Sequence, residues 1–80
     1  MQVLYFAALR DLTGLAEEQL ELPVAVETVR DFISHLQLIR PALVGNLASV
    51  RVALDEAFAN DSDALADAHV IALIPPVAGG

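Results

Sequence analysis

Cysteine, lysine and tryptophan are absent from the sequence, and basic side chains of any kind are scarce. The lack of cysteine excludes disulfide bridges and thiolate metal sites, so the chain must rely on its core for stability. Four arginines face eleven acidic residues, which gives a net charge of −7 at pH 7. Binding to the phosphate backbone of nucleic acids, or to an anionic membrane surface, needs clustered positive charge that this chain lacks. We therefore expect no nucleic-acid partner and no membrane partner.

Long hydrophobic runs and targeting signals are absent as well. No stretch approaches the roughly 18 consecutive apolar residues of a membrane-spanning helix. The first ten residues, MQVLYFAALR, have neither the basic start nor the cleavage pattern of a signal peptide. These absences predict a cytoplasmic protein.

The chain is nonetheless rich in hydrophobic residues for its size. It has 80 residues, enough for one domain, and a domain this short buries only about 60% of its unfolded surface. Hydrophobic residues make up 56% of the sequence, compared with roughly 45–50% in an average domain. Because so small a core cannot absorb all of this material, we expect an exposed apolar patch that serves as a binding surface.

The first quarter of the sequence predicts two strands. Residues 2–9, QVLYFAAL, form a nearly continuous apolar run typical of a strand at the centre of a sheet. Residues 10–14, RDLTG, are typical of a turn. Residues 16–22, AEEQLEL, alternate as in a half-buried strand, in which Glu18 shares a side with the leucines. We expect the two strands to form a hairpin that Pro23 ends.

A helix is predicted after this hairpin. Thr28 is a suitable N-cap, and Asp31 three residues later completes a pattern like a capping box. The apolar residues of its buried face recur at helical spacing, namely Val29, Phe32, Ile33 and Leu36. The helix must end by Arg40, because proline disfavours helical geometry in the residue before it. Residues 41–47, PALVGNL, then indicate a connector with room for one short helical turn.

The last third of the sequence predicts three more strands. Residues 50–59, VRVALDEAFA, indicate a hairpin with Asp55 and Glu56 at its tip. Residues 60–68 are typical of a polar loop, and residues 69–74, HVIALI, indicate a strand with apolar side chains on both faces. The element order is therefore β-β-α-β-β-β. The apolar runs predict that the first and last strands are buried on both faces. Placing these two strands in parallel at the centre, with the helix across them, predicts an α+β fold of the β-grasp type with a mixed sheet.

The serines and histidines predict no catalytic site. No suitable base accompanies Ser34, Ser49 or Ser62 in the predicted elements. His35 lies one position from the apolar stripe of the helix, and His69 begins a strand. We expect both histidines to be structural or exposed.

The acidic residues predict no site either. Asp61, Asp63 and Asp67 are spaced like calcium ligands, but the turn glycine and the closing glutamate of a calcium loop are missing. We therefore expect a solvated loop there, and no metal or cofactor bound by this chain.

The end of the chain carries the most specific signal. After the last strand come Pro75, Pro76, Val77, Ala78, Gly79 and Gly80. The prolines cannot continue a strand ladder and favour an extended conformation of about 3.1 Å per residue, so six such residues would reach roughly 18 Å beyond the sheet. The glycines let the backbone approach another surface closely. We predict a domain at residues 1–74 and a flexible tail at residues 75–80 that presents its terminal carboxylate to a partner's active site.

A terminal carboxylate reacts only after it has been activated. Adenylation would convert it to a mixed anhydride, from which a sulfur nucleophile could displace AMP and leave a thiocarboxylate. The absence of cysteine and lysine is consistent with this chemistry, because no internal thiol or amine competes for the activated carbonyl.

Three stretches of the sequence carry a resemblance to a known family. LYFAALRDLTG, residues 4–14, is similar to an aromatic-rich first strand followed by an Ala-x-x-Arg-[Glu/Asp]-x-x-Gly turn. TVRDFISHL, residues 28–36, resembles a capped helix, and VIALIPPVAGG, residues 70–80, resembles a strand with a Pro-Pro-Val-x-Gly-Gly terminus. The family with these features is the small, sulfur-carrying subunit of molybdopterin synthase, and the resemblance covers essentially the whole chain.

The resemblance implies a β-grasp, ubiquitin-like fold and a sulfur carrier of molybdenum cofactor biosynthesis. It implies that Gly80 is adenylated by an E1-like adenylyltransferase that uses ATP, and is then thiocarboxylated. Gly79 would be the slender approach, and residues 75–78 the stiff arm that inserts into the large synthase subunit, in a heterotetramer. There the sulfur would pass to cyclic pyranopterin monophosphate, with the catalytic side chains supplied by the large subunit.

The sequence departs from the family pattern at two places, and three other functions are open to the chain. The family commonly has Asp-Gly-Asp-Glu before the last strand, where this chain has Asp67-Ala68-His69, and it has Asn or Gly at the hairpin tip, where this chain has Asp55-Glu56. The alternatives are a sulfur carrier of another pathway, such as thiamine thiazole formation, a ubiquitin-like protein modifier, and a β-grasp binding module with a passive tail. The pair of prolines favours the molybdopterin family over the other carriers.

Overall fold

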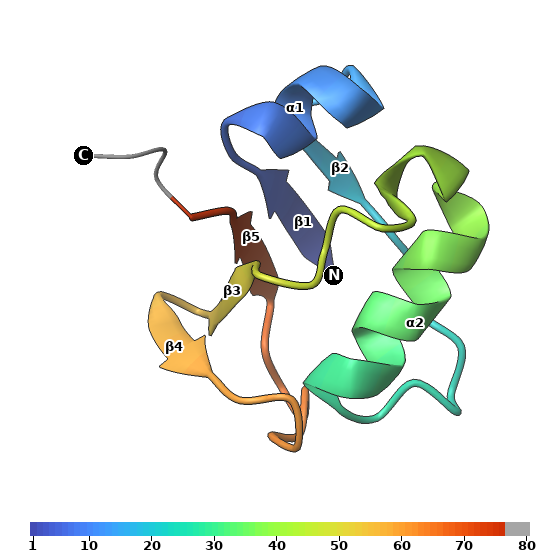
Figure 1. The fold of residues 1–80 in the computed structure, drawn as a ribbon. Helices are drawn as coiled ribbons and strands as arrows, with labels where there is room; N and C mark the ends of the chain where they lie inside the picture. The colour runs from blue at the N-terminus through green and yellow to red at the C-terminus, as the bar shows by residue number, and fades with distance from the viewer. Residues whose placement is uncertain (77–80) are drawn as a thin grey trace.

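The structure, a computed structural model, describes residues 1–76, and Figure 1 shows a mixed sheet with a helix packed on one face. The strands are β1 (Gln2–Tyr5), β2 (Glu17–Gln19), β3 (Arg51–Leu54), β4 (Ala57–Ala59) and β5 (Val70–Ile74). The helices are α1 (Ala8–Thr13), α2 (Val29–Ile39) and the 3₁₀ turn η1 (Pro41–Leu43). The strand order is β2-β1-β5-β3-β4, so β1 and β5 lie inside the sheet and β2 and β4 form its edges.

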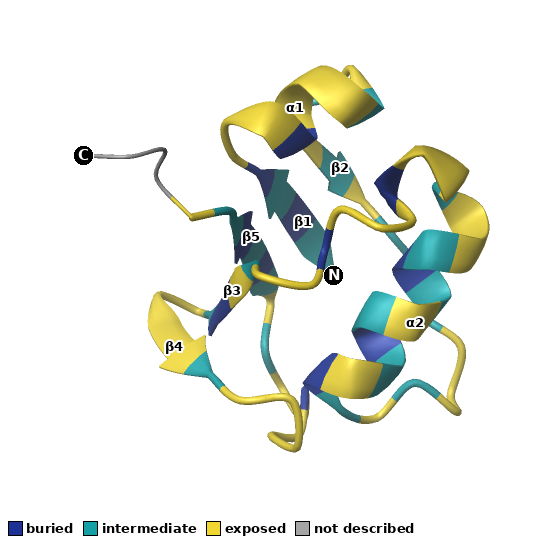
Figure 2. Ribbon diagram, viewed as in Figure 1, coloured by how far each residue is buried: buried dark blue, intermediate teal, exposed yellow. Residues whose placement is uncertain are grey.

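The two inner strands run parallel, as the sequence predicts, with Val3 opposite Ile71 and Tyr5 opposite Leu73. The prediction that both strands are buried on both faces is wrong. These four side chains are at most 1% exposed, but the residues that alternate with them are only half-buried, as the dark blue and teal bands of Figure 2 show. The reason is that α2 covers one face of the sheet, while no described element covers the other.

The main helix is capped as the sequence predicts. The side chain of Thr28 accepts the backbone N–H of Asp31 at 3.2 Å, and the Asp31 carboxylate accepts the N–H of Thr28 at 3.2 Å. Val29, Phe32 and Leu36 are fully buried against the sheet, each stabilising the fold by about 1.5–3 kcal/mol. The helix has 11 residues, and within residues 1–76 no helix is long and apolar enough to cross a membrane.

Helix α1 replaces the strand end and the turn that the sequence predicts before residue 14. Ala7 reverses the chain with φ 51° and ψ −127°, a backbone conformation uncommon outside glycine. The helix then buries Leu9, which is 1% exposed, and ends at Gly14 in the left-handed conformation with φ 74°. A short apolar run does not distinguish a strand from a helix by its period, so the prediction of a strand over residues 2–9 was wrong after Tyr5. The order is β-α-β-α-β-β-β, with one helix more than predicted.

Both predicted strand pairs are antiparallel, with shorter strands than the sequence indicates, and α1 rather than a turn joins the first pair. The tip of the β3–β4 hairpin has Asp55 at φ 46° and Glu56 at φ 74°, which are the positive values of a primed turn. The Asp55 carboxylate accepts the backbone N–H groups of His69 and Val70, both at 2.9 Å. The aspartate thus joins the tip to the start of β5, a role that a glycine could not fill.

Candidate functional site

The ladder of the sheet ends at the last residue of an inner strand, which Pro75 and Pro76 follow. β5 ends at Ile74, and its neighbours there are Phe6, whose N–H donates to the Leu73 carbonyl at 3.3 Å, and Arg51, the register partner of Ile74. The first of the two following prolines is half-buried and the second is exposed. Because neither has an N–H group, the ladder cannot continue past this point. We call Ile74, Pro75 and Pro76 the tail root.

Only part of the predicted site lies within the described residues. Pro75 and Pro76 directly follow the last strand, as the sequence indicates. Val77, Ala78, Gly79 and Gly80 fall outside the described residues. The stiff arm, the slender approach and the sulfur-bearing terminus assigned to these residues therefore stay predictions.

The uncovered face of the sheet, here the outer face, is apolar beside the tail root. The strand register places on it the apolar side chains of Leu4, Ala53, Phe58, Val70, Ala72 and Ile74. Phe58 is 63% exposed, and the guanidinium carbon of Arg51 lies 4.1 Å from the centroid of its ring. Of the six side chains, Ala53 is buried, Phe58 is exposed and the other four are half-buried. This partly exposed apolar surface is a candidate for the patch that the composition predicts.

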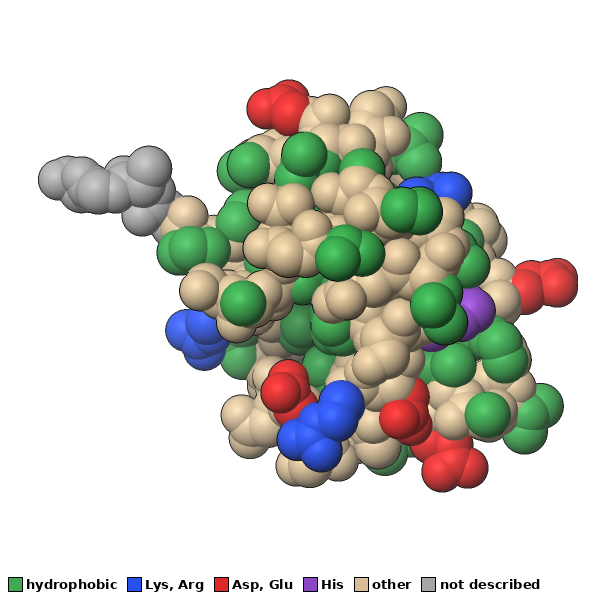
Figure 3. Space-filling model, turned by 45° about the vertical axis from the view of Figure 1, so that its right-hand side comes forward, with side chains coloured by type: hydrophobic (Ala, Val, Ile, Leu, Met, Phe, Trp, Pro, Cys, Tyr) green, Lys and Arg blue, Asp and Glu red, His purple; other side chains and the backbone are tan. Residues whose placement is uncertain are grey.

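Further hydrophobic side chains lie on the surface around α1, as Figure 3 shows. Phe6 and Leu12 are each 40% exposed there. Apolar surface therefore borders the tail root from the β1–α1 side as well as from the outer face.

On the covered side of the sheet, one carboxylate joins three elements. Glu18 of β2 accepts the Tyr5 hydroxyl at 2.5 Å and the Nε of Arg40 at 3.0 Å, and a second bond and ion pair links Nη2 of Arg40 to its other oxygen. The hydrogen bond from Arg40 holds the pKa of Glu18 below its usual value. Burial, and then the bond to Glu18, raises the pKa of the Tyr5 hydroxyl. The carboxylate therefore stays ionised and the phenol neutral, which makes the cluster a clamp between β1, β2 and the end of α2.

Sequence reasoning identified neither this clamp nor the position of Arg51. A signal for the clamp was present, because Glu18 shares its side of the strand with leucines, and a carboxylate on an apolar side needs a partner. Its partner Arg40 is 22 residues away in sequence, so no local spacing indicates it. Arg51 and Phe58 could have been placed on one face from the register of the predicted hairpin around its two-residue tip.

The other polar candidates do not gather into a site. His35 is half-buried on α2, and His69 is exposed before β5. The acidic loop residues are all exposed, namely Asp61, Asp63 and Asp67. The carboxylate of Asp63 accepts the N–H of Asn60 at 2.8 Å, so it shapes the loop. Within residues 1–76, no group of three or more histidine, aspartate or glutamate side chains is placed to hold a metal ion.

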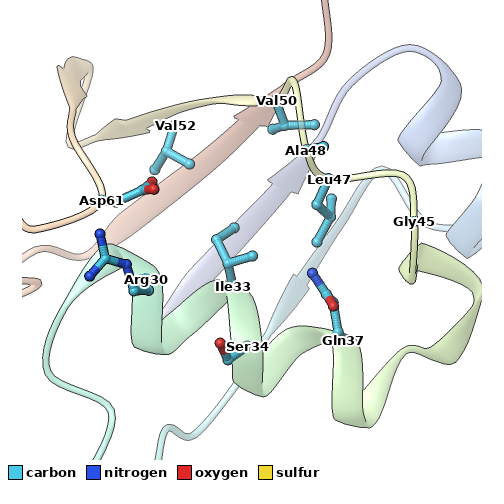
Figure 4. A pocket seen from close by; sticks show the side chains of 10 residues that line it. All are labelled: Arg30, Ile33, Ser34, Gln37, Gly45, Leu47, Ala48, Val50, Val52 and Asp61. Atoms are coloured by element: carbon cyan, nitrogen blue, oxygen red, sulfur yellow. The ribbon is translucent and has the colours of Figure 1, made fainter.

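A hollow of about 320 Å³ lies between α2 and the segment around β3 (Figure 4). Arg30, Ser34 and Gln37 border it from the helix, and Val50 and Val52 border it from the other side. No histidine lines it, and it shares no residue with the tail root. We therefore place the candidate functional site at the tail root and the outer face.

Comparisons with known proteins give a family and close relatives. A model of the ThiS family matches residues 3–80. The chain is 33% identical to the molybdopterin synthase sulfur carrier subunit of Chlamydomonas reinhardtii, in a match that covers 100% of this chain and 98% of that protein. It is 34% identical to the protein of the same name from Arabidopsis thaliana, covering 100% of this chain and 82% of that protein.

Solved structures share the fold. SAMP1 from Haloferax volcanii, a small archaeal modifier protein, has a TM-score of 0.83 at 25% identity, covering 99% of this chain and 97% of that one. A chain in the complex of subunits 1 and 2 of the molybdopterin-converting factor from Helicobacter pylori has a TM-score of 0.67 at 24% identity, covering 99% and 96%. These likenesses confirm the predicted α+β fold of the β-grasp type. Because the Helicobacter pylori chain is 24% identical, its likeness to this chain shows a shared fold alone.

Proposed function

Because this chain belongs to the ThiS family, and its curated relatives are sulfur carrier subunits of molybdopterin synthase, we propose that it carries sulfur for molybdenum cofactor biosynthesis on the carboxyl group of Gly80. The observation that carries the proposal is the end of β5 at Ile74, inside the sheet, followed by the sequence PPVAGG. Two residues without an N–H group direct the chain out of the ladder. Residues 75–80 then serve as a tail on a domain of residues 1–74.

In the proposed route, an E1-like adenylyltransferase supplies the ATP site, and this chain binds no cofactor of its own. A carboxylate oxygen of Gly80 attacks the α-phosphorus of ATP, and pyrophosphate leaves. Hydrosulfide, HS⁻, then attacks the carbonyl carbon of the acyl adenylate, AMP leaves with the electron pair of the broken bond, and loss of the S–H proton gives the thiocarboxylate. The glycine at position 79 allows this terminus to pass through a narrow channel, because it has no side chain.

The proposed acceptor is the large subunit of molybdopterin synthase, in a heterotetramer and in the cytoplasm. The tail, residues 75–80, enters the large subunit, and the sulfur passes there to cyclic pyranopterin monophosphate. The apolar outer face beside the tail root supports this proposal, since it offers a docking surface next to the point where the tail departs. Catalytic side chains for the transfer then belong to the large subunit.

A second candidate function is that of a ubiquitin-like protein modifier. The likeness to a small archaeal modifier protein favours it, because that protein has the same fold at 25% identity. A modifier would use the same activated terminus but pass the carbonyl of Gly80 to a lysine amine of a target protein, with AMP as the leaving group.

Intact mass spectrometry separates these functions. The full chain is incubated with the cognate E1-like enzyme, ATP and a sulfide donor, with and without target proteins. A mass gain equal to the exchange of one oxygen for sulfur supports the carrier. Conjugates of higher mass support the modifier, and an unchanged mass contradicts both.

A further inference from the structure

Arg51 occupies a particular place on the outer face. It opens β3, directly across from Ile74, the last residue of β5. Its side chain therefore stands at the tail root, on the same face as the apolar patch. The ring of Phe58 lies 4.1 Å from its guanidinium carbon, a distance typical of a cation–π contact.

The N–H donors of the Arg51 guanidinium have no hydrogen-bond acceptor within the described residues. Within residues 1–76, Arg51 takes part in no ion pair and its side chain donates no hydrogen bond. An arginine has five N–H donors in a planar fork that matches a carboxylate. The aromatic ring holds this fork in place before any partner arrives, which lowers the entropy lost on binding.

Acidic side chains lie at the end of the outer face that is far from Arg51. A shallow hollow there is lined by Asp55 and Glu56, together with Val70 at the start of β5. Glu17, on the edge strand β2 and level with Ala72, borders the same hollow from the side. The five residues of β5 separate this acidic end from Arg51 by roughly 13 Å. Among residues 1–76, the face therefore has an acidic end, an apolar middle and one arginine beside the tail root.

We propose that Arg51 receives a carboxylate of the protein into which the tail inserts, and that this pair sets the orientation of docking. The inference rests on the proposed function and gives the chemistry of the partner's docking surface. That surface is apolar in the middle, acidic opposite Arg51 and basic opposite the acidic end of the outer face. A partner docked the other way round would bring like charges together, which costs binding free energy. Only the correct orientation points the tail into the partner's channel.

A carboxylate of the partner protein fits this position better than a phosphate of the nucleotide or of the pterin. In an extended tail, the terminus of Gly80 would lie roughly 18 Å from Ile74, because each of the six residues between spans about 3.1 Å. The groups that react with the terminus are then out of reach of an arginine fixed beside Ile74. What can meet Arg51 is the rim of the partner's channel.

The test uses the full chain and the purified large subunit of molybdopterin synthase from the same organism, with affinity measured by calorimetry. Arg51→Met keeps an apolar stem against Phe58 but removes the charge, and we expect the Kd to rise about tenfold. Arg51→Glu places like charges together, and we expect a rise of about a hundredfold. Arg51→Lys keeps the charge without the planar fork, so its Kd should lie between wild type and Arg51→Met.

Arg30→Glu is the matched control, because it changes the net charge equally from an exposed position on α2. We expect its Kd to stay within about twofold of wild type. Equal affinities for Arg51→Glu and Arg30→Glu, whether both weak or both unchanged, overturn the assignment of Arg51 alone. If the wild-type chain does not bind the large subunit, the proposed partner is wrong and the assignment falls with it. Thermal melts confirm that each variant is folded.

Discussion

Arg40 and Glu18 join the end of the main helix to an edge strand, with the Nε of Arg40 donating to the Glu18 carboxylate at 3.0 Å and Nη2 bonding the other oxygen. The same carboxylate accepts the hydroxyl of Tyr5, whose side chain is 1% exposed. Tyr5 lies in the inner strand that pairs with β5, so the clamp supports the strand from which the tail departs.

Removal of the shared carboxylate should destabilise the fold. In Glu18→Ala, the buried hydroxyl of Tyr5 loses its acceptor, and we expect the free energy of unfolding to fall by about 1–3 kcal/mol. Urea unfolding measures the loss. Glu21→Ala, at an exposed position three residues later, is the control and should change stability by less than about 0.5 kcal/mol. Equal stabilities of the two variants would contradict a structural role for the clamp.

Stability should fall in acid. Hydrogen bonds lower the pKa of three carboxylates, those of Glu18, Asp31 and Asp55. The donor to Glu18 is Arg40. The donors to the two aspartates are backbone N–H groups, namely those of Glu27 and Thr28 for Asp31 and those of Val70 and His69 for Asp55. Because each folded pKa lies below the unfolded value of about 4, the unfolded chain binds more protons in this range. The contribution is complete above about pH 5 and is lost as the pH falls through the folded values.

Unfolding in urea between about pH 6 and pH 3 tests this dependence. Asp31→Asn should flatten the curve, since it removes one of the three carboxylates. Asp67→Asn is the control, because the Asp67 carboxylate accepts no hydrogen bond from residues 1–76. A wild-type curve that rises toward low pH would refute the prediction.

A glycine at the tip of the β3–β4 hairpin should raise the stability of the chain. Glu56 adopts φ 74°, where a side chain costs about 1–2 kcal/mol relative to glycine. We expect Glu56→Gly to stabilise the chain by about 1 kcal/mol, observed as a higher urea midpoint. Ala48→Gly, at a position without positive φ, should lower the midpoint instead. The idea fails if both glycine variants shift the midpoint in the same direction.

Deletion of Gly80 should abolish sulfur transfer and leave the fold intact. Gly80 lies four residues beyond the two prolines that follow the last strand, so we expect its removal to cost the core little. A pterin-conversion assay and a thermal melt test the two halves of the prediction. A chain that lacks Gly80, or both terminal glycines, and still supports conversion would refute the role of the terminus.

A charge on the apolar outer face should weaken docking to the large subunit. Ala72 lies on this face between Leu4 and Ala53 in the register of the sheet. We expect Ala72→Glu to raise the Kd at least about tenfold, because docking would bury an unpaired carboxylate. Ser34→Glu, on the exposed side of α2, should leave the Kd nearly unchanged. Normal binding by Ala72→Glu would exclude the outer face as the docking surface.

Sequence alone determined the features that depend on a few neighbouring residues. Thr28 and Asp31 specify where α2 begins, because a cap acts within one turn of helix. Pro75 specifies where β5 ends, because a residue without an N–H group cannot extend a ladder. The apolar runs of the first and last strands indicated that both belong inside the sheet, and their parallel pairing followed.

Tertiary structure alone decided the rest. Residues 8–13 form a helix rather than a strand because Leu9 reaches the core that way, and a run this short fits either period. Glu18 meets Arg40 only because the end of α2 packs beside β2, and no local pattern connects residues 22 positions apart. Likewise, the sequence indicated surplus apolar surface but not its location. That surface lies beside Arg51 and the tail root because α2 covers only one of the two faces of the sheet.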